Sequence, residues 1–397
     1  MNPADPDIDQ VLNAFVYRLY ARAQHGEVAG SASGLIISDA AQIDAVLRAP
    51  DRFHKNYSLI AALGHSRFST NGAEWEWRRE LTQSAYGRAG TPGNRGTVIA
   101  TYAEALAACE TPAPRAIQRA LLRASTTIFL LAFGQIAATE SLLAVFDRTR
   151  RVLKLLQYFS WHPPGEDVLP LLRKETETLL EDFSREVIRS PALSALLEKM
   201  QRSRKSDENF AALSEFLMNF FAGVETTAAT LCFAIDRLGI DSRVEQRLFS
   251  EVDAEETPYI DCFLNETMRY FPPIPFVARQ VAIDTKIGSA SLRAGQLVIL
   301  SIVEVHHDPK FWNEPHIFDC SRAEFLRNTY DRRAFIPFLA GPRMCGGARL
   351  ARMELTEGLK AFLRRFKVER KGDEIQFDYG LALRPNSWDR VEISRRI

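Results

Sequence analysis

Apolar residues recur at steps of three and four positions from about Leu106 to Gly239, with few prolines between them. This spacing places the apolar side chains on one face of a helix, so it predicts a mainly helical region. Earlier in the chain, "SGLIISDAAQIDAVLRAP" predicts a strand followed by a helix that begins after Asp39. After Pro272, short β-branched runs broken by prolines and glycines predict loops and small strands.

The rest of the pattern completes a mainly α fold with a minor β part. The polar stretch 202–209 predicts a loop, a helical period returns after Cys345, and the tail from Phe377 predicts a hairpin. No linker rich in proline, glycine and serine divides the chain. We therefore expect residues 1–397 to form a single domain.

Composition narrows the class of protein. The 397 residues include 50 basic and 50 acidic side chains, so bulk charge does not indicate binding to nucleic acid or to a membrane surface. The five cysteines are scattered and form no C-x-x-C pair, which favours a reducing, cytoplasmic setting over disulfides or zinc. The start lacks the pattern of a signal peptide. We expect no segment to be long and apolar enough to cross a bilayer, since residues 126–138 are apolar but too short, and we expect no membrane anchor.

The stretch "FIPFLAGPRMCGGARLARMEL" contains the strongest chemical signal. Its spacing is Phe338-x-x-Gly341-x-Arg343-x-Cys345-x-Gly347, directly before a predicted helix. A helix N-terminus favours an anion, so we expect a lowered pKa for the Cys345 thiol and a thiolate there. A thiolate can be the axial ligand of haem iron, and Arg343 can pair with a haem propionate.

Each other position in this motif also has a physical interpretation. Gly341 and Gly347 permit turns or close approach, and Phe338 can pack over the sulfur. The alternative is a buried free cysteine in a glycine-rich turn, which is the usual state of a lone cysteine. Five matched positions within ten residues, followed by a helix, outweigh that alternative.

At these residues the sequence resembles the haem-thiolate monooxygenases, the cytochromes P-450. The resemblance extends over nearly the whole chain and implies that family's fold, a helical prism that holds haem b between the oxygen-binding helix and the helix after the cysteine. Two positions depart from the family pattern, Leu339 in place of glycine or serine and Gly346 in place of an apolar residue. Gly346 could loosen the packing beside the sulfur.

A second motif pair supports the resemblance. "LNETMRYFPP" carries Glu266 and Arg269, which share one helical face, and "EPHIFDCSR" carries Arg322. An ordinary surface ion pair is the plainer interpretation of Glu266 and Arg269 alone. In the resembled family these residues form a buried network that braces the cysteine loop, and we expect that structural role here.

The apolar helical stretch "FAGVETTAATL" contains Glu225 and Thr226. Thr226 can bond back to the carbonyl of Ala222 and bend the helix, and Gly223 leaves room beside the bend. A packing kink in a core helix is the alternative. The resemblance implies an oxygen-binding groove, in which Glu225 and Thr226 relay protons during catalysis.

Further cations match positions that bind haem propionates in the family. Trp75 and Arg79 lie four apart on one helical face, and Arg279 follows a proline-rich stretch. The alternative for the first pair is a surface cation that rests on an indole. Arg78, on another face, is expected at the surface. His306 and His307 are adjacent, and in a strand adjacent side chains point to opposite faces, so we reject a metal site there.

The expected activity is oxidation of a small, largely apolar organic molecule with dioxygen, as in secondary metabolism. The resemblance to soluble bacterial members implies electrons from a ferredoxin or flavodoxin with its NAD(P)H reductase. The family's layout places Phe221, Ala222, Phe276 and Val277 at the substrate pocket, although plain core packing explains them nearly as well. The region between Phe53 and Asn71 and the helices around 155–190 are expected to gate entry. The alternatives are a peroxide-using enzyme or isomerase, a nitrating enzyme, and a non-catalytic haem sensor.

Overall fold

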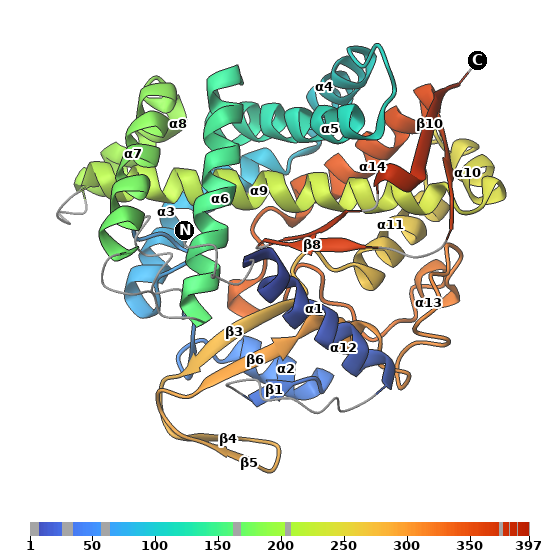
Figure 1. Ribbon diagram of the computed structural model, residues 1–397. Coiled ribbons are helices and arrows are strands. Elements are labelled where there is room, and N and C mark those ends of the chain that lie inside the picture. The colour runs from blue at the N-terminus through green and yellow to red at the C-terminus, as the bar shows by residue number, and fades with distance from the viewer. Residues whose placement is uncertain are drawn as a thin grey trace.

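The computed structural model describes residues 8–25, 35–56, 64–161, 168–202, 208–372, 376–380, 382–386 and 388–396. Helices form most of these ranges, and short strands form small sheets between and beside them (Figure 1). The predicted mainly α fold with a minor β part is therefore confirmed. The predicted loop at 202–209 lies largely outside the described residues.

The helices are α1 (Ile8–His25), α2 (Ala40–Arg48), α3 (Gly72–Ala89), α4 (Arg95–Ala107), α5 (Pro114–Phe129), α6 (Glu140–Trp161), α7 (Val168–Val187), α8 (Pro191–Arg202), α9 (Glu208–Leu238), α10 (Ser242–Phe249), α11 (Pro258–Tyr270), α12 (Ile302–His306), α13 (Ala323–Leu326) and α14 (Ala348–Arg365). The strands are β1 (Leu35–Ile37), β2 (Phe53–His54), β3 (Phe276–Val281), β4 (Thr285–Ile287), β5 (Ala290–Leu292), β6 (Leu297–Ser301), β7 (Phe366–Arg370), β8 (Phe377–Tyr379), β9 (Leu383–Pro385) and β10 (Val391–Arg395).

The largest described sheet has the strand order β1-β6-β3-β2. β1 pairs with β6 in parallel, whereas β3 pairs with β6 and with β2 in antiparallel fashion. The predicted strand before Asp39 is β1, and the Asp39 side chain accepts a hydrogen bond from the N–H of Gln42 at the start of α2. The predicted tail hairpin is β8 and β9, while β10 pairs instead with β7.

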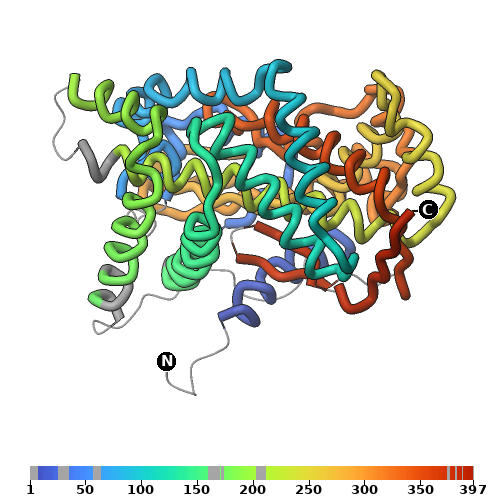
Figure 2. Tube along the Cα trace, turned by 90° about the horizontal axis from the view of Figure 1, so that it is seen from above, coloured from blue at the N-terminus to red at the C-terminus, as the bar shows by residue number. Residues whose placement is uncertain are grey.

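Helix α9 runs through the middle of the molecule, and the other long helices cross it or pack along it (Figures 1 and 2). It contacts α5, α8, α11 and α14. By length and composition, Pro114–Gly134 and Ala212–Leu238 could each cross a bilayer, so the prediction that no segment could do so is wrong. In the second span 83% of the most apolar window is buried within the protein, and core helices pass the same test of length and composition.

The first described helix packs against a strand from late in the chain. Helix α1 packs on β8, where Asn13 donates to Asp378 at 3.0 Å and accepts from the N–H of Tyr379 at 2.6 Å. The rings of Tyr17 and Phe377 stack with centroids 4.1 Å apart. This contact joins residues about 360 positions apart along the chain.

The structure places His306 at the end of α12 and His307 directly after it, where a strand was assumed. The stated reason for rejecting a metal site was therefore wrong. Both rings are buried, and the part of the chain that the structure describes holds no cluster of three or more His, Cys, Asp or Glu side chains that could bind a metal ion.

Candidate functional site

The cysteine loop, Phe335–Gly347, is folded by its own backbone before α14 begins. The N–H of Cys345 donates to the carbonyl of Phe338 at 2.9 Å, and Gly341–Arg343 form a short 3-10 turn. Gly341 has φ +73°, and a Cβ there would lie 2.5 Å from the carbonyl oxygen of Leu47. Gly341 is therefore required for both its conformation and its close approach to α2.

Leu339 has φ +58°, a left-handed conformation that side chains rarely adopt. Leu339 stands where the family often has glycine or serine, and a glycine would adopt this backbone conformation without strain. Gly347, by contrast, has φ −87° and serves as the N-cap residue of α14. The predicted place of Cys345, just before a helix N-terminus, is confirmed.

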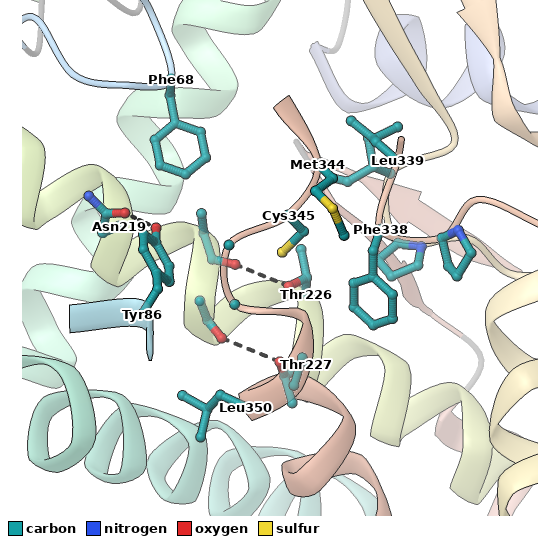
Figure 3. A pocket seen from close by; sticks show the side chains of 18 of the residues that line it. Phe68, Tyr86, Asn219, Thr226, Thr227, Phe338, Leu339, Met344, Cys345 and Leu350 are labelled. Atoms are coloured by element: carbon teal, nitrogen blue, oxygen red, sulfur yellow. Dashed lines mark hydrogen bonds between the residues drawn. The ribbon is translucent and has the colours of Figure 1, made fainter. Parts of the chain in front are cut away.

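The Cys345 sulfur faces a cavity, the cysteine cavity, between the cysteine loop and α9. Figure 3 shows Thr226 facing the sulfur, with Tyr86 and Asn219 on one side and Phe338 and Met344 on the other. Apolar side chains make up most of the wall, among them Phe129, Phe133, Ile274 and Leu350. A largely apolar cavity with a few polar groups is typical of a site for a small molecule or cofactor.

The pKa of the Cys345 thiol is raised, because the surrounding protein disfavours the charged form. The N–H of Gly347 and the charges of Arg67 and Lys55 act in the opposite direction but do not outweigh this effect. The predicted lowering of the pKa by the helix N-terminus is therefore wrong for the protein without a bound metal ion. A coordinated metal ion deprotonates a thiol outright, so this correction does not remove Cys345 as a ligand.

The hydrogen bond predicted for Thr226 is present within α9, which is a continuous helix, while the bend there stays a prediction. Its hydroxyl donates to the carbonyl of Ala222 at 3.0 Å, and Thr227 bonds back to Gly223 at 3.3 Å (Figure 3). The space beside Gly223 is filled, because a Cβ there would lie 2.6 Å from the ring of Phe129. Glycine thus allows α5 to pack closely against α9, which differs from the predicted open room.

Glu225 does not line the cysteine cavity, in contrast to Thr226. It faces a separate, charged cleft, where its carboxylate lies 3.6 Å from Arg384. Burial raises its pKa, while the charges of Arg150 and Arg384 oppose that shift. Glu225 and Thr226 therefore face different cavities, since adjacent helical residues point about 100° apart, and their joint proton relay stays a prediction.

Cations gather at one end of the cysteine cavity. Arg343 stacks over the Trp75 ring at 4.3 Å and donates to the carbonyl of Thr70 at 2.8 Å. The pKa of Lys55 is lowered well below its usual value, first by burial and then by the charges of Arg279, Arg343 and Arg67. A cluster of positive charge in a low-dielectric wall favours a carboxylate.

These residues fit a haem. The cavity offers a sulfur between α9 and the cysteine loop, apolar walls for a porphyrin, and cations for its carboxylates. Arg79 does not take part: its side chain is exposed and its guanidinium lies 5.6 Å from the Trp75 ring centroid. The exposed position of Arg79 contradicts its predicted role at a propionate and matches the alternative of a cation resting on an indole.

Arg78 was expected at the surface, but it is buried. It lies 3.0 Å from Glu74 and 3.4 Å from Glu215, a buried carboxylate on α9. The backbone N–H of Arg67 donates to the same carboxylate at 2.8 Å. Adjacent arginines on α3 thus have opposite environments, because only one of them faces α9.

Four polar side chains on the wall of the cysteine cavity were not predicted from the sequence: Lys55, Arg67, Tyr86 and Asn219. The Tyr86 hydroxyl donates to Asn219, and Arg67 lies 4.8 Å from the Tyr86 ring centroid. A Cβ on Gly346 would lie 3.1 Å from that ring, so the small residue beside Cys345 makes room for Tyr86. Gly346 replaces the apolar residue of the family pattern, and this small residue was the signal that could have suggested a bulky neighbour.

The predicted buried network is present. Arg269 and Arg322 both donate to the two oxygens of Glu266, at 2.7–2.8 Å and 2.8–3.0 Å respectively. All three side chains are buried. The arginines also donate to backbone carbonyls of the segment before α13, among them that of Ile317.

Of the predicted pocket residues, Ala222 lines the cysteine cavity. Phe221 instead stacks on Phe146, and Phe276 packs against Phe15 and Tyr379. Val277 belongs to the buried core. For these three residues the alternative of core packing fits the structure better than a place in the cavity.

The family model described as cytochrome P450 matches residues 165–388. Cytochrome P450 4V2 of Mus musculus is 32% identical over 194 residues, and cytochrome P450 3A5 of Homo sapiens is 30% identical over 184 residues. These alignments cover 44% and 43% of this chain, and 37% of the length of each relative.

Solved structures share the fold. A zebrafish cytochrome P450 with abiraterone has a TM-score of 0.75 at 23% identity, and the match covers 97% of this chain and 99% of that chain. A 6-coordinated cytochrome P450 from Thermus thermophilus has a TM-score of 0.72 at 20% identity, with 91% and 92% covered.

Proposed function

The chain belongs to the cytochrome P450 family, and from this membership we propose that it is a haem-thiolate monooxygenase for a small, largely apolar organic substrate. The observation that carries the proposal is the Cys345 sulfur, which faces α9 across the cysteine cavity. When bound, haem b supplies the iron at which dioxygen is activated.

Different residues of the chain would hold the iron and the carboxylates of the haem. Cys345 would hold the iron, and the N–H of Gly347 would stabilise negative charge on its sulfur. Arg343, Lys55 and Arg67, with Arg279 nearby, would hold the carboxylates.

On the opposite wall, Thr226 presents a hydroxyl whose proton is donated to the carbonyl of Ala222. It can hold or pass a proton at Oγ1. The aromatic wall of Phe129 and Phe133 would bind an apolar substrate and exclude water. Glu225 could reach this hydroxyl only through other groups or water.

The test is the absorption spectrum of the reduced, haem-loaded protein with carbon monoxide. We expect the red-shifted Soret band of a thiolate adduct in the wild type and its loss in Cys345→Ala, because alanine offers no ligand. Cys320→Ala is the matched control, since Cys320 is a partly buried cysteine outside the cysteine cavity. A wild type without the band, or a Cys345→Ala variant that keeps it, would overturn the proposal.

The proposal also covers the source of electrons, the location of the enzyme and its metabolic role. We propose electrons from a separate ferredoxin or flavodoxin with an NAD(P)H reductase, a cytoplasmic location, and a role in secondary metabolism. The competing activity is use of peroxide without such a partner. Turnover of a substrate found by its spin-state shift, with reductase and NAD(P)H but not with peroxide alone, would support the first activity; the reverse would support the second.

A further inference from the structure

We propose that His306 is a positioning residue that links the cysteine loop to the buried Glu266–Arg269–Arg322 network by hydrogen bonds and so fixes the position of the Cys345 sulfur. The inference rests on the proposed haem-thiolate function. It assigns a role to a side chain that does not touch the cysteine cavity.

The imidazole of His306 bridges two segments that are far apart in the chain. Its Nε2 accepts a hydrogen bond from the N–H of Ile336, at the start of the cysteine loop, at 2.9 Å. Its Nδ1 lies 3.2 Å from the carbonyl oxygen of Arg269, at the end of α11. Since Nε2 accepts, Nδ1 carries the proton and donates to Arg269, so a single neutral tautomer satisfies both bonds.

Each end of this bridge is itself fixed. The Arg269 guanidinium is held by Glu266 and also donates to the carbonyl of His306 at 2.7 Å, so the histidine is bound through both its ring and its backbone. On the loop side, the carbonyl of Ile336 accepts from the N–H of Leu339 at 2.9 Å. The carbonyl of Phe338, in turn, accepts from Cys345. Hydrogen bonds thus run in short steps from the buried network to the cysteine.

The surroundings keep the ring in the required state. His306 has no exposed surface, and its ring packs against Phe335 with centroids 5.6 Å apart. Burial, with the charge of Arg269 second, lowers its pKa to about 3. The ring therefore stays neutral near neutral pH, and Nε2 keeps the lone pair that Ile336 needs.

The next residue provides a matched control. His307 is also buried, and its Nδ1 is bonded to the carbonyl of Val303 at 2.8 Å. Its ring packs against Tyr20, Tyr270 and His316, on the side of α1. Substitution of His307 perturbs a buried histidine of the same segment without touching the contact to Ile336.

The experiment compares three variants of the full chain: His306→Gln, His306→Asn and His307→Gln. A glutamine amide reaches the position of Nε2 and can still accept from Ile336. An asparagine amide reaches the position of Nδ1 and cannot. The first readout is amide hydrogen exchange at Ile336 without haem. We expect protection in wild type, His306→Gln and His307→Gln, and its loss in His306→Asn.

The second readout is the thiolate fraction of the reduced carbon monoxide complex. We expect the ratio of the thiolate form to the non-thiolate form to fall about fivefold to tenfold in His306→Asn. This is the change in an equilibrium constant that the loss of one buried hydrogen bond predicts. His306→Gln and His307→Gln should stay within about twofold of wild type, since both keep that bond.

Rapid exchange at Ile336 in the wild type would overturn the inference even if His306→Asn does not fold. So would equal thiolate fractions in His306→Asn and wild type, or equal losses in all three variants, which would indicate general destabilisation. A wild type without any thiolate band would instead overturn the proposed function, and this inference with it.

Discussion

At the scale of single residues, the cysteine loop depends on one glycine. Gly341 combines φ +73° with a Cβ direction that leads to the backbone of α2, 2.5 Å from the Leu47 oxygen. Backbone cannot move aside as a flexible side chain can. The loop is therefore less tolerant of a methyl group at Gly341 than at Gly346 or Gly347, where the nearest atom would lie 3.1 Å or 3.8 Å from the added Cβ.

Gly341→Ala should lower the free energy of unfolding by about 2 kcal/mol or more, from left-handed strain of about 1–2 kcal/mol plus the clash. Urea unfolding of the haem-loaded protein measures the change. The control is Gly87→Ala at an exposed position of α3, where a Cβ meets no neighbour within 4 Å and the helix should gain roughly 0.5–1 kcal/mol. Equal stability of Gly341→Ala and wild type would contradict this account.

At the scale of elements, the Glu266 network joins α11 to the segment before α13. Glu266 accepts four hydrogen bonds from two arginines, and its own side chain has no exposed surface. Removal of a buried carboxylate between two guanidiniums should lower the free energy of unfolding strongly, because both cations would then lie buried without a counter-charge.

Glu266→Gln should cost about 3–5 kcal/mol of unfolding free energy, the usual effect of breaking a buried ion pair. Denaturant unfolding measures it. Glu324→Gln is the control, since Glu324 lies 4.0 Å from Arg322 with a side chain 21% exposed and should contribute at most about 1 kcal/mol. A loss no larger than that of the control would show that the network does not stabilise this part of the fold.

Elements also explain which site predictions were correct. The Cys345 loop follows from a short spacing, because the same few residues supply both the turn and the chemistry. The Glu266 network was predicted from the resemblance, since Arg322 lies 56 positions from Glu266. Arg78 and Arg79 are adjacent, and their environments depend on Glu215, 137 positions from Arg78. Such a partner is brought by packing of α3 on α9, which local spacing does not reveal.

The same reasoning applies to Glu225. Its partner Arg384 lies on β9, far along the chain, so the motif could predict the hydrogen bond of Thr226 but not the cleft that Glu225 faces. Lys55 and Arg67 precede α3 in a segment without a regular period, and no pattern marked them. The fold class, in contrast, was predictable because helical periodicity extends over long segments.

At the scale of the whole molecule, pH should act on stability through Glu354. This carboxyl group of α14 is buried on the wall of the cysteine cavity and accepts from Tyr102 at 3.2 Å. Burial raises its pKa from 4.5 to about 8. Since the folded state holds this proton and the unfolded state releases it, stability from this group is full below about pH 4.5 and is lost as pH rises to about 8.

Glu354→Gln should remove this slope, because glutamine is neutral at every pH. The difference in unfolding free energy between variant and wild type should grow between about pH 5 and pH 8, by on the order of a few kcal/mol in favour of the variant. Unfolding curves at a series of pH values give the difference directly. A difference that does not change with pH would show that the pKa of Glu354 is the same in both states.

The contact between α1 and β8 has a consequence for biosynthesis. Asn13 and Tyr17 find their partners among residues about 360 positions later in the chain, so these contacts of α1 cannot form while those residues are still to be made. The part of α1 that packs on β8 stays uncovered until β8 leaves the ribosome. Docking of α1 on β8 is therefore a late step of folding.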